Sequence, residues 1–295
     1  EILRCLVGSE MCIRDRHMGY AFDFKVRELK NEPTLQYIRD SWLMAMAEMD
    51  SEQRATWEAI YDKKNEEFLK NPPVGKDLLR WKYQRYVKEY CRTIRSVDEQ
   101  VGRLLDYLEE KGVLDNTVIV YTSDQGFLLG EHGLYDKRFM YEESFRTPLI
   151  ISCPSLVKKH SVCKELVQNI DLAPTFLSLA GVEVPKEMSG RSLLPLFKNG
   201  KAENWRNELY YHFYDYPAVG SVRKHDGIRT KRYKLIHWHG EGSGNDEAID
   251  FWELYDLKKD VMEVNNVYDN PKYVKVREAL TVQLEKLRKD VGVTE

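Results

Sequence analysis

A long apolar stripe constrains the fold of this chain more than any other feature. Between about Asp77 and Lys111, apolar side chains recur at steps of three and four residues, the period of an amphipathic α-helix. Gly112 then supplies a typical helix stop. The sequence therefore predicts one unbroken helix over 77–111. Its apolar face comprises Val87, Tyr90, Ile94, Val97, Val101, Leu104 and Leu108.

Two runs rich in β-branched and apolar residues follow this helix. Thr117–Thr122 and Pro148–Ser152 have the composition of buried strands. A helix is then predicted from Leu172 to Ala180, with Asp171 as its N-cap. The order helix, strand, loop, strand, helix is typical of an α/β fold. We expect both strands to be buried in one mixed sheet, with the long helix packed against it.

The pattern changes after Trp205. Four short strands are predicted, and Lys231-Arg232 suits the turn of an antiparallel hairpin. A last amphipathic helix is expected over 271–289. We therefore place a boundary near residue 205, between an α/β part and a smaller antiparallel sheet with a C-terminal helix. The predicted strands are Leu209–Tyr214, Gly227–Thr230, Tyr233–Trp238 and Trp252–Leu257.

Composition excludes several classes of protein. Of 295 residues, 42% are hydrophobic, which is enough for a substantial core and argues against disorder. A net charge of −3 does not suit binding to nucleic acid or to an anionic membrane. No run approaches the ~20 apolar residues of a membrane helix. The five cysteines form no CxxC pair, which excludes a zinc ribbon.

The first sixteen residues do not resemble a native protein segment. They read EILRCLVGSEMCIRDR and lack the basic end, apolar run and small-residue cleavage site of a signal peptide. We interpret residues 1–16 as translated sequencing adapter, with an irregular native N-terminus as the alternative. On that interpretation only Cys91, Cys153 and Cys163 are native, and any export signal lies upstream of this chain.

Polar residues at the end of the first predicted strand form a candidate metal site. Asp124 offers a carboxylate and Gln125 an amide oxygen at the carboxyl edge of this strand, where α/β sheets place ligands. Such hard oxygen donors suit Ca²⁺ or Mg²⁺ rather than zinc. The alternative is an ordinary turn. A polar, glycine-punctuated loop over 130–138 follows directly and favours a functional site.

These segments together resemble sulfatases, the formylglycine-dependent members of the alkaline phosphatase superfamily. The resemblance extends from about residue 79 to the C-terminus and is closest to bacterial carbohydrate sulfatases, including N-acetylglucosamine-6-sulfatase-like enzymes. It implies that 17–205 is the C-terminal part of an alkaline-phosphatase-like α/β sandwich and 206–295 an α+β subdomain. The matching motifs are Tyr121-Thr122-Ser123-Asp124-Gln125-Gly126, Gly130-Glu131-His132-Gly133, Lys137, Arg146-Thr147-Pro148, Asn169-Ile170-Asp171-Leu172-Ala173-Pro174-Thr175 and Trp252-Glu253-Leu254-Tyr255-Asp256-Leu257.

The resemblance assigns roles to three residues. Asp124 and Gln125 match the family's ligands of an active-site Ca²⁺, which we expect rather than Mg²⁺. Lys137 matches the lysine that contacts sulfate oxygens; the alternative is a solvated surface lysine. A cation and an ammonium both stabilise charge on those oxygens. His132 orients the loop or contacts substrate, or else is purely structural.

The C-terminal part is expected to contribute substrate contacts. Lys224 and His225 lie beside aromatic residues, and this combination suits a sulfated sugar. His225 is the residue most expected to contact the sugar. The alternative is that the neighbouring tyrosines only fill the core between the two parts.

The family's nucleophile has no counterpart in this chain. Sulfatases of this type oxidise a Cys or Ser in C-x-[P/A]-x-R to formylglycine, which attacks as a covalent catalyst. Cys12 and Arg16 have the right spacing but enclose Arg14 in place of Pro or Ala, and Cys91 heads an equally mismatched segment. The chain is therefore expected to be inactive alone.

Three functions remain open from the sequence. The first is part of a sulfuric ester hydrolase that removes sulfate from a carbohydrate. The second is a phosphodiesterase or phosphatase of the same superfamily, and the third is a non-catalytic carbohydrate-binding relative. The expected partner is a sulfated carbohydrate, not nucleic acid or membrane. The family also implies a periplasmic or extracellular location.

Overall fold

The computed structural model describes residues 47–216, 222–240 and 248–293. The predicted adapter segment lies outside these residues. The chain divides into two compact units, and each is described by itself. The first comprises Glu1–Glu110 and Leu128–Asp136, and the second comprises Lys111–Phe127 and Lys137–Glu295.

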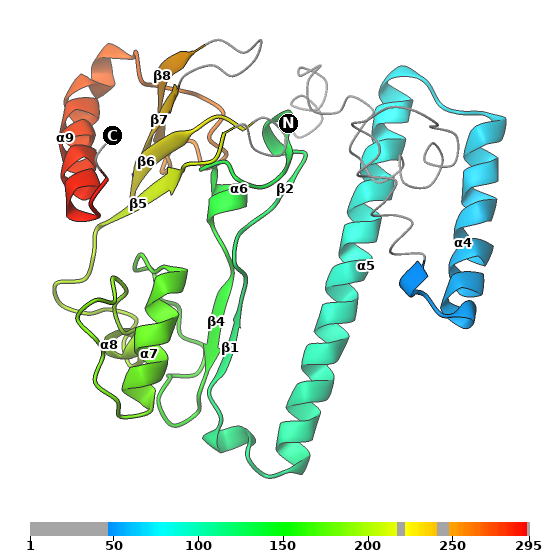
Figure 1. Ribbon diagram of the computed structural model, residues 1–295, viewed down its shortest axis with the longest axis horizontal. Coiled ribbons are helices and arrows are strands. Elements are labelled where there is room, and N and C mark those ends of the chain that lie inside the picture. The colour runs from blue at the N-terminus through cyan, green and yellow to red at the C-terminus, as the bar shows by residue number, and fades with distance from the viewer. Residues whose placement is uncertain (1–46, 217–221, 241–247, 294–295) are drawn as a thin grey trace. The chain divides into compact units, whose positions relative to one another are not determined.

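Two helices dominate the described part of the first unit (Figure 1). Helix α4 (Ser51–Lys70) begins with a capping box in which Asp50 and Gln53 bond reciprocally. Helix α5 (Gly75–Glu110) is continuous, which confirms the long helix predicted from the apolar stripe. The two helices pack through Phe68 and Trp81, whose ring centroids are 4.1 Å apart.

The apolar stripe of α5 is only partly covered within the described residues. Ile94, Val97 and Leu104 are 45–56% exposed. The predicted packing of this helix against the strands involves both units and stays a prediction. The first unit also holds the short strands β2 (Leu128–Leu129) and β3 (Tyr135–Asp136), which pair antiparallel around the 3₁₀ turn η2 (Glu131–Gly133).

In the second unit, the 3₁₀ turn η1 (Leu114–Asn116) leads to strand β1 (Ile119–Thr122), which pairs antiparallel with β4 (Leu149–Ser152). The expectation that both strands are buried in a mixed sheet is wrong for the described residues. They form a two-stranded antiparallel ladder, and its residues are half-buried or exposed. The physical reason is that, in the part of the chain that the structure describes, each strand has only the other as a neighbour.

Short helices flank β4 in the sequence. Helix α6 (Glu142–Phe145) precedes it, and η3 (Asn169–Asp171), α7 (Leu172–Leu179) and α8 (Leu194–Phe197) come after it. Helix α7 confirms the predicted helix, but Asp171 does not cap it with its side chain. The buried Asp171 carboxylate instead pairs with Arg206 and accepts the backbone N–H groups of Gln168 and Arg191, each at 2.8 Å. This network joins η3 to the segment that leads into the next sheet.

The four-stranded antiparallel sheet has the order β5-β6-β7-β8. Its strands are β5 (Glu208–Phe213), β6 (His225–Thr230), β7 (Tyr233–Gly240) and β8 (Ile249–Asp256). Lys231-Arg232 forms the β6–β7 turn, as predicted, since Arg229 is paired with Lys234. The C-terminal helix is also confirmed, as the turn η5 (Pro271–Tyr273) followed by α9 (Val274–Asp290).

Each face of this sheet packs against a different partner. On one face, Ile228, Leu235 and Leu254 form a core with Leu280 and Leu284 of α9, which runs alongside the sheet in Figure 1. On the other face, Ile236, Trp238 and Tyr255 pack against Met140. Met140 belongs to the segment that begins at Lys137, so this second face supports the candidate site.

The α/β class, with antiparallel sheets and a C-terminal helix, is thus confirmed. The boundary near residue 205 stays a prediction. Cys153 is buried, and Cys91 and Cys163 are exposed free thiols. Among the described residues, no helix combines the length and apolar character needed to cross a membrane.

Candidate active site

The site is built around the loop that follows β1. Thr122 donates its hydroxyl to the Pro148 carbonyl at 2.9 Å, which closes the end of the β1–β4 ladder. The Asp124 carboxylate accepts the Gln125 N–H at 3.0 Å, and Ser123 Oγ donates to the Gln125 carbonyl at 2.9 Å. The loop is therefore a compact polar turn, and the Asp124 side chain is exposed at its tip.

Asn169, at the start of η3, holds this loop through two hydrogen bonds. Its side-chain amide donates to the carbonyl oxygens of Ser123 at 3.1 Å and Asp124 at 3.0 Å. Sequence reasoning noticed Asn169 only as part of a matching motif and gave it no role. The sequence indicated this role only weakly, because an Asn before a helix is usually a capping or turn residue.

Gly126 brings the loop against α6. Its N–H donates to the Ser144 carbonyl at 2.8 Å. A Cβ at this position would overlap with the backbone carbonyl of Glu143. Only glycine allows this close approach, so the position of Asp124 and Gln125 depends on it.

The segment that carries Lys137 is held by the four-stranded sheet. Tyr211 donates its hydroxyl to the Arg138 carbonyl at 2.7 Å. Lys234, which is fully buried in β7, donates from Nζ to the Met140 carbonyl at 2.7 Å. Two backbone carbonyls after Lys137 are thus fixed by side chains from the sheet. Neither Tyr211 nor Lys234 was singled out for this role from the sequence.

A buried charge cluster extends this anchoring. Lys234 Nζ lies 2.9 Å from Glu142 Oε1 and 2.6 Å from Glu263 Oε1. Burial alone pulls the pKa of Glu142 upward, but the charges of Lys234 and Arg229 outweigh burial and hold that pKa below its usual range. Burial dominates at Glu263 and raises the pKa of its carboxyl. Lys234 therefore sits between one ionised carboxylate and one that resists ionisation.

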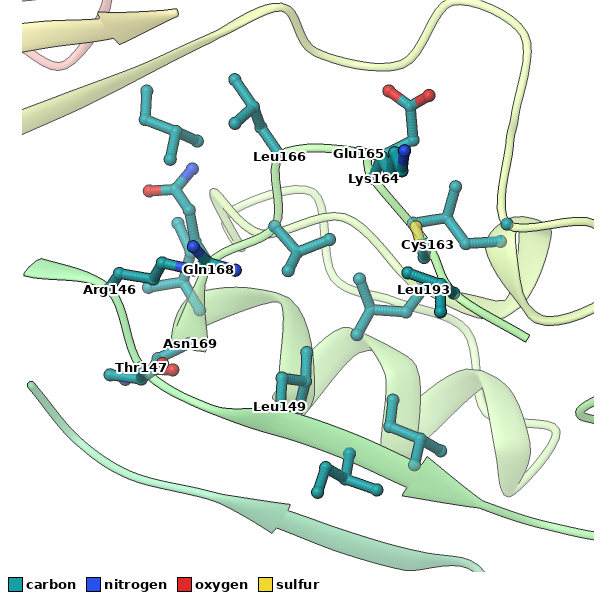
Figure 2. Close-up of a pocket in the computed structure, with 18 of the residues that line it drawn as sticks. Arg146, Thr147, Leu149, Cys163, Lys164, Glu165, Leu166, Gln168, Asn169 and Leu193 are labelled. Carbon is teal, nitrogen blue, oxygen red and sulfur yellow. The ribbon is translucent and has the colours of Figure 1, made fainter. Parts of the chain in front are cut away.

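Asp124, Gln125 and Lys137 all line one cavity of the second unit, of about 1710 Å³. Arg138, Arg146 and Asn169 line it as well. Figure 2 shows Arg146, Gln168 and Asn169 grouped at one end of the view, with apolar side chains such as Leu149 between them and Leu193. The cavity thus combines polar side chains beside the β1 loop with apolar side chains such as Leu149, and further charged side chains, among them Lys164 and Glu165, lie elsewhere in its lining. The roles of Asp124, Gln125 and Lys137 stay predictions.

The lining of this cavity is rich in positive charge. Eight of its residues are Lys or Arg, and three are Asp or Glu. One acid, Glu142, pairs with Arg229 at 3.2 Å, and another, Glu165, pairs with Lys231 at 2.6 Å. The remaining acid is Asp124. Such a lining attracts an anionic substrate.

His225 lies in a buried, aromatic environment. It is 0% exposed and stacks on Trp238 at 4.2 Å, and its Nδ1 lies 2.8 Å from the Arg223 carbonyl. Burial lowers the pKa of His225 to about 4, so it is neutral near pH 7. His225 Nε2 is buried and has no hydrogen-bond partner among the described residues. The expected contact between His225 and a sugar stays a prediction.

The other two expected contacts are not among the residues that line the cavity. Lys224, next to His225, is half-buried and is not among the residues that line it. His132 lies in the first unit, in the turn η2, with a left-handed φ of 56° between Gly130 and Gly133. Its predicted role in orienting the loop or touching substrate stays a prediction.

Ca²⁺ is compatible with the donor chemistry at the loop tip. Asp124 and Gln125 supply a carboxylate and an amide oxygen, which are hard ligands. Because Ca²⁺ takes about six to eight oxygens, these two side chains would make up only part of its coordination shell. Water or groups outside the described residues would provide the rest. No residue of the chain fits the formylglycine precursor, so no step through that group is derived.

The fold and this loop define the class of protein. The sequence matches the family "N-sulphoglucosamine sulphohydrolase, C-terminal" over residues 130–290 and the family "Sulfatase" over residues 43–182. The chain belongs to the sulfatase family. This confirms the resemblance drawn from the motifs around Asp124 and Lys137.

Three individual relatives show which members of the family this chain is similar to. The chain is 46% identical over 269 residues to an N-acetylglucosamine-6-O-sulfatase of Bacteroides thetaiotaomicron, covering 90% of this chain and 47% of that protein. It is 35% identical over 196 residues to the multifunctional alkaline phosphatase superfamily protein PehA of Trinickia caryophylli, covering 62% of this chain and 36% of PehA. The solved structure of BT4656 with its substrate D-glucosamine-2-N,6-O-disulfate matches with a TM-score of 0.79 and 41% identity, covering 97% of this chain and 62% of that one. The chain thus spans between 36% and 62% of the length of these three relatives.

Proposed function

We propose that the protein carrying this chain is a carbohydrate sulfatase that hydrolyses a sulfate ester of an amino sugar. The observation that supports the proposal is that Asp124, Gln125 and Lys137 are all in the lining of one cavity with an excess of positive charge. The similarity to an N-acetylglucosamine-6-O-sulfatase supports the sugar class. Because sulfated glycan polymers lie outside cells, we extend the proposal to a periplasmic or extracellular location.

The reaction would cleave the S–O bond of the ester. Water supplies the oxygen that sulfate gains, the sugar regains its hydroxyl, and hydrogen sulfate leaves. Lys137 would bind sulfate oxygens and stabilise the charge that develops on them. A Ca²⁺ held by Asp124 and Gln125 would supply Lewis-acid stabilisation when bound. Asn169 and Gly126 keep the loop in position, and Tyr211 and Lys234 do the same for the Lys137 segment.

The test measures sulfate release from a 6-O-sulfated glucosamine. The protein is expressed from the reading frame with its upstream DNA restored and with formylglycine formation. Lys137→Ala should lower kcat/KM by about 10²–10³-fold, roughly 2.7–4 kcal/mol, as when one preorganised donor is lost. Asp124→Ala should lower it further, because Asp124 is expected to hold the cation. Lys186→Ala is the matched control, since Lys186 is exposed and is not among the residues that line the cavity.

Several outcomes would contradict the proposal. One is a Lys137→Ala enzyme as fast as its parent. A second is higher kcat/KM on a phosphate ester than on the sulfate ester, which favours the phosphodiesterase or phosphatase alternative. A third is sugar binding without turnover, which favours a non-catalytic relative. The 295-residue chain alone should release no sulfate, because it contains no C-x-[P/A]-x-R motif.

A further inference from the structure

A second cluster of metal-binding side chains lies on the α9 face of the four-stranded sheet. Asp226 of β6 is paired directly with His237 of β7, and His239 follows two residues later on the same face. Their ligand atoms all lie within 4.8 Å of one another. Leu235, two residues before His237, packs against α9, whereas Met140 and the Lys137 segment pack on the opposite face. The cluster is therefore separate from the proposed sulfatase site.

The distances suit a small cation bound between the three side chains. Asp226 Oδ1 lies 3.8 Å from His237 Nδ1 and 3.8 Å from His239 Nε2. Zinc bonds of about 2.0–2.1 Å place tetrahedral ligand atoms about 3.4 Å apart. Each of these two Asp–His pairs therefore needs to close by about 0.4 Å, and the two imidazole nitrogens lie within 4.8 Å of each other. Two imidazoles and one carboxylate favour Zn²⁺ and its transition-metal neighbours over Ca²⁺.

A second carboxylate orients one of the imidazoles. Asp250 Oδ1 lies 2.8 Å from His237 Nε2 on the edge of the ring away from Asp226. With the Nε2 proton donated to Asp250, Nδ1 keeps its lone pair toward Asp226. This carboxylate–histidine arrangement is the usual support of a metal-binding imidazole. Tyr210 adds a hydrogen bond of 3.2 Å to Asp226 Oδ2.

A guanidinium group currently provides the positive charge at this position. Arg288 Nη2 lies 2.6 Å from Asp226 Oδ1 and 3.1 Å from His237 Nδ1, so it bridges two of the three ligand atoms. Arg288 Nη1 also pairs with Glu285 at 2.5 Å, one turn earlier on α9. Asp226 is only 1% exposed, and it requires a compensating cation. The cluster is thus built to hold positive charge, and Glu285 offers Arg288 an alternative partner.

We propose that Asp226, His237 and His239 form a binding site for a borderline divalent cation, represented by Zn²⁺. Arg288 occupies the site in the absence of metal and moves toward Glu285 when the metal binds. The proposal does not depend on the sulfatase activity, because it rests on the other face of the sheet.

The experiment uses the full 295-residue chain with its thiols alkylated, so that exposed cysteines do not bind zinc. Zn²⁺ affinity is measured by competition with a chromophoric chelator. We expect one equivalent to bind, with no displacement by millimolar Ca²⁺. His239→Ala should abolish this binding, and Asp250→Asn should weaken it by about 10–100-fold, as for other groups that orient a metal-binding histidine. His160→Asn is the matched control, since His160 is exposed and outside the cluster.

Arg288→Gln distinguishes this site from a chance pair of surface histidines. Removing the competing guanidinium should tighten Zn²⁺ binding. It should also make thermal stability depend on zinc, because the metal then becomes the compensating charge for Asp226. The proposal is overturned if no stoichiometric Zn²⁺ binds, if His239→Ala binds as tightly as the parent, or if Arg288→Gln binds no more tightly than the parent.

Discussion

Replacing Asp171 with Ala is expected to be strongly destabilising, since the side chain is fully buried in a network of four hydrogen bonds. Two come from the Arg206 guanidinium, and two come from the backbone N–H groups of Gln168 and Arg191. Arg206 is itself 9% exposed, so its charge would be left buried and unpaired. Breaking a buried pair in this way costs about 3–5 kcal/mol. At about 2–4 °C per kcal/mol for a unit of this size, Tm should fall by about 6–20 °C.

The assay is urea denaturation followed by near-ultraviolet circular dichroism, with a thermal melt in parallel. Asp269→Ala is the control, because Asp269 is exposed and its removal should change stability by less than about 0.5 kcal/mol. The double variant Asp171→Ala/Arg206→Leu should recover part of the loss, since it removes the uncompensated charge. A loss below about 1 kcal/mol for Asp171→Ala, or a double variant no better than the single one, would refute the reasoning.

Two further predictions concern the surroundings of the site. Gly126→Ala should destabilise the chain by about 1–3 kcal/mol in urea, because its Cβ overlaps with a backbone carbonyl, whereas Gly102→Ala in open space on α5 should stabilise it by about 0.5–1 kcal/mol. Equal effects of the two substitutions would contradict this. Because Lys234 and Arg229 hold the pKa of Glu142 below 4.5, its ionised form stabilises the fold above that pH, and the contribution is lost as pH falls through the lowered pKa. Stability measured from pH 6 to pH 3 should therefore fall less steeply in Glu142→Gln than in the parent, and an unchanged profile would count against the pairing.

Local patterns predicted much of the fold because they depend on neighbours in the sequence. The period of the apolar stripe was sufficient to predict α5, and the Lys231-Arg232 pair was sufficient to predict the β6–β7 hairpin. Burial of β1 and β4 could not be predicted in the same way. A β-branched run such as that of β1 indicates a strand, but the number of neighbouring strands is decided by distant parts of the chain.

The candidate site, like the fold, could be predicted from the sequence only in part. Asp124, Gln125 and Lys137 could be named because they lie in short motifs that match a family. The side chains that hold them could not, since Asn169 and Lys234 act on backbone carbonyls far away in sequence. The role of His225 could not be decided from the sequence, because a histidine next to aromatic residues fits both a sugar contact and a buried aromatic stack.

The open ladder of β1 and β4 has a consequence for handling this chain in solution. Within the described residues each strand has one partner, so the outer edge of each is available for further pairing. Tyr121 and Ile150 are direct cross-strand partners and are 40% and 62% exposed. An unprotected strand edge beside exposed apolar side chains is a template for edge-to-edge association. We therefore expect the isolated chain to self-associate as its concentration rises, and a charged residue in place of Ile150 should delay the onset of light scattering.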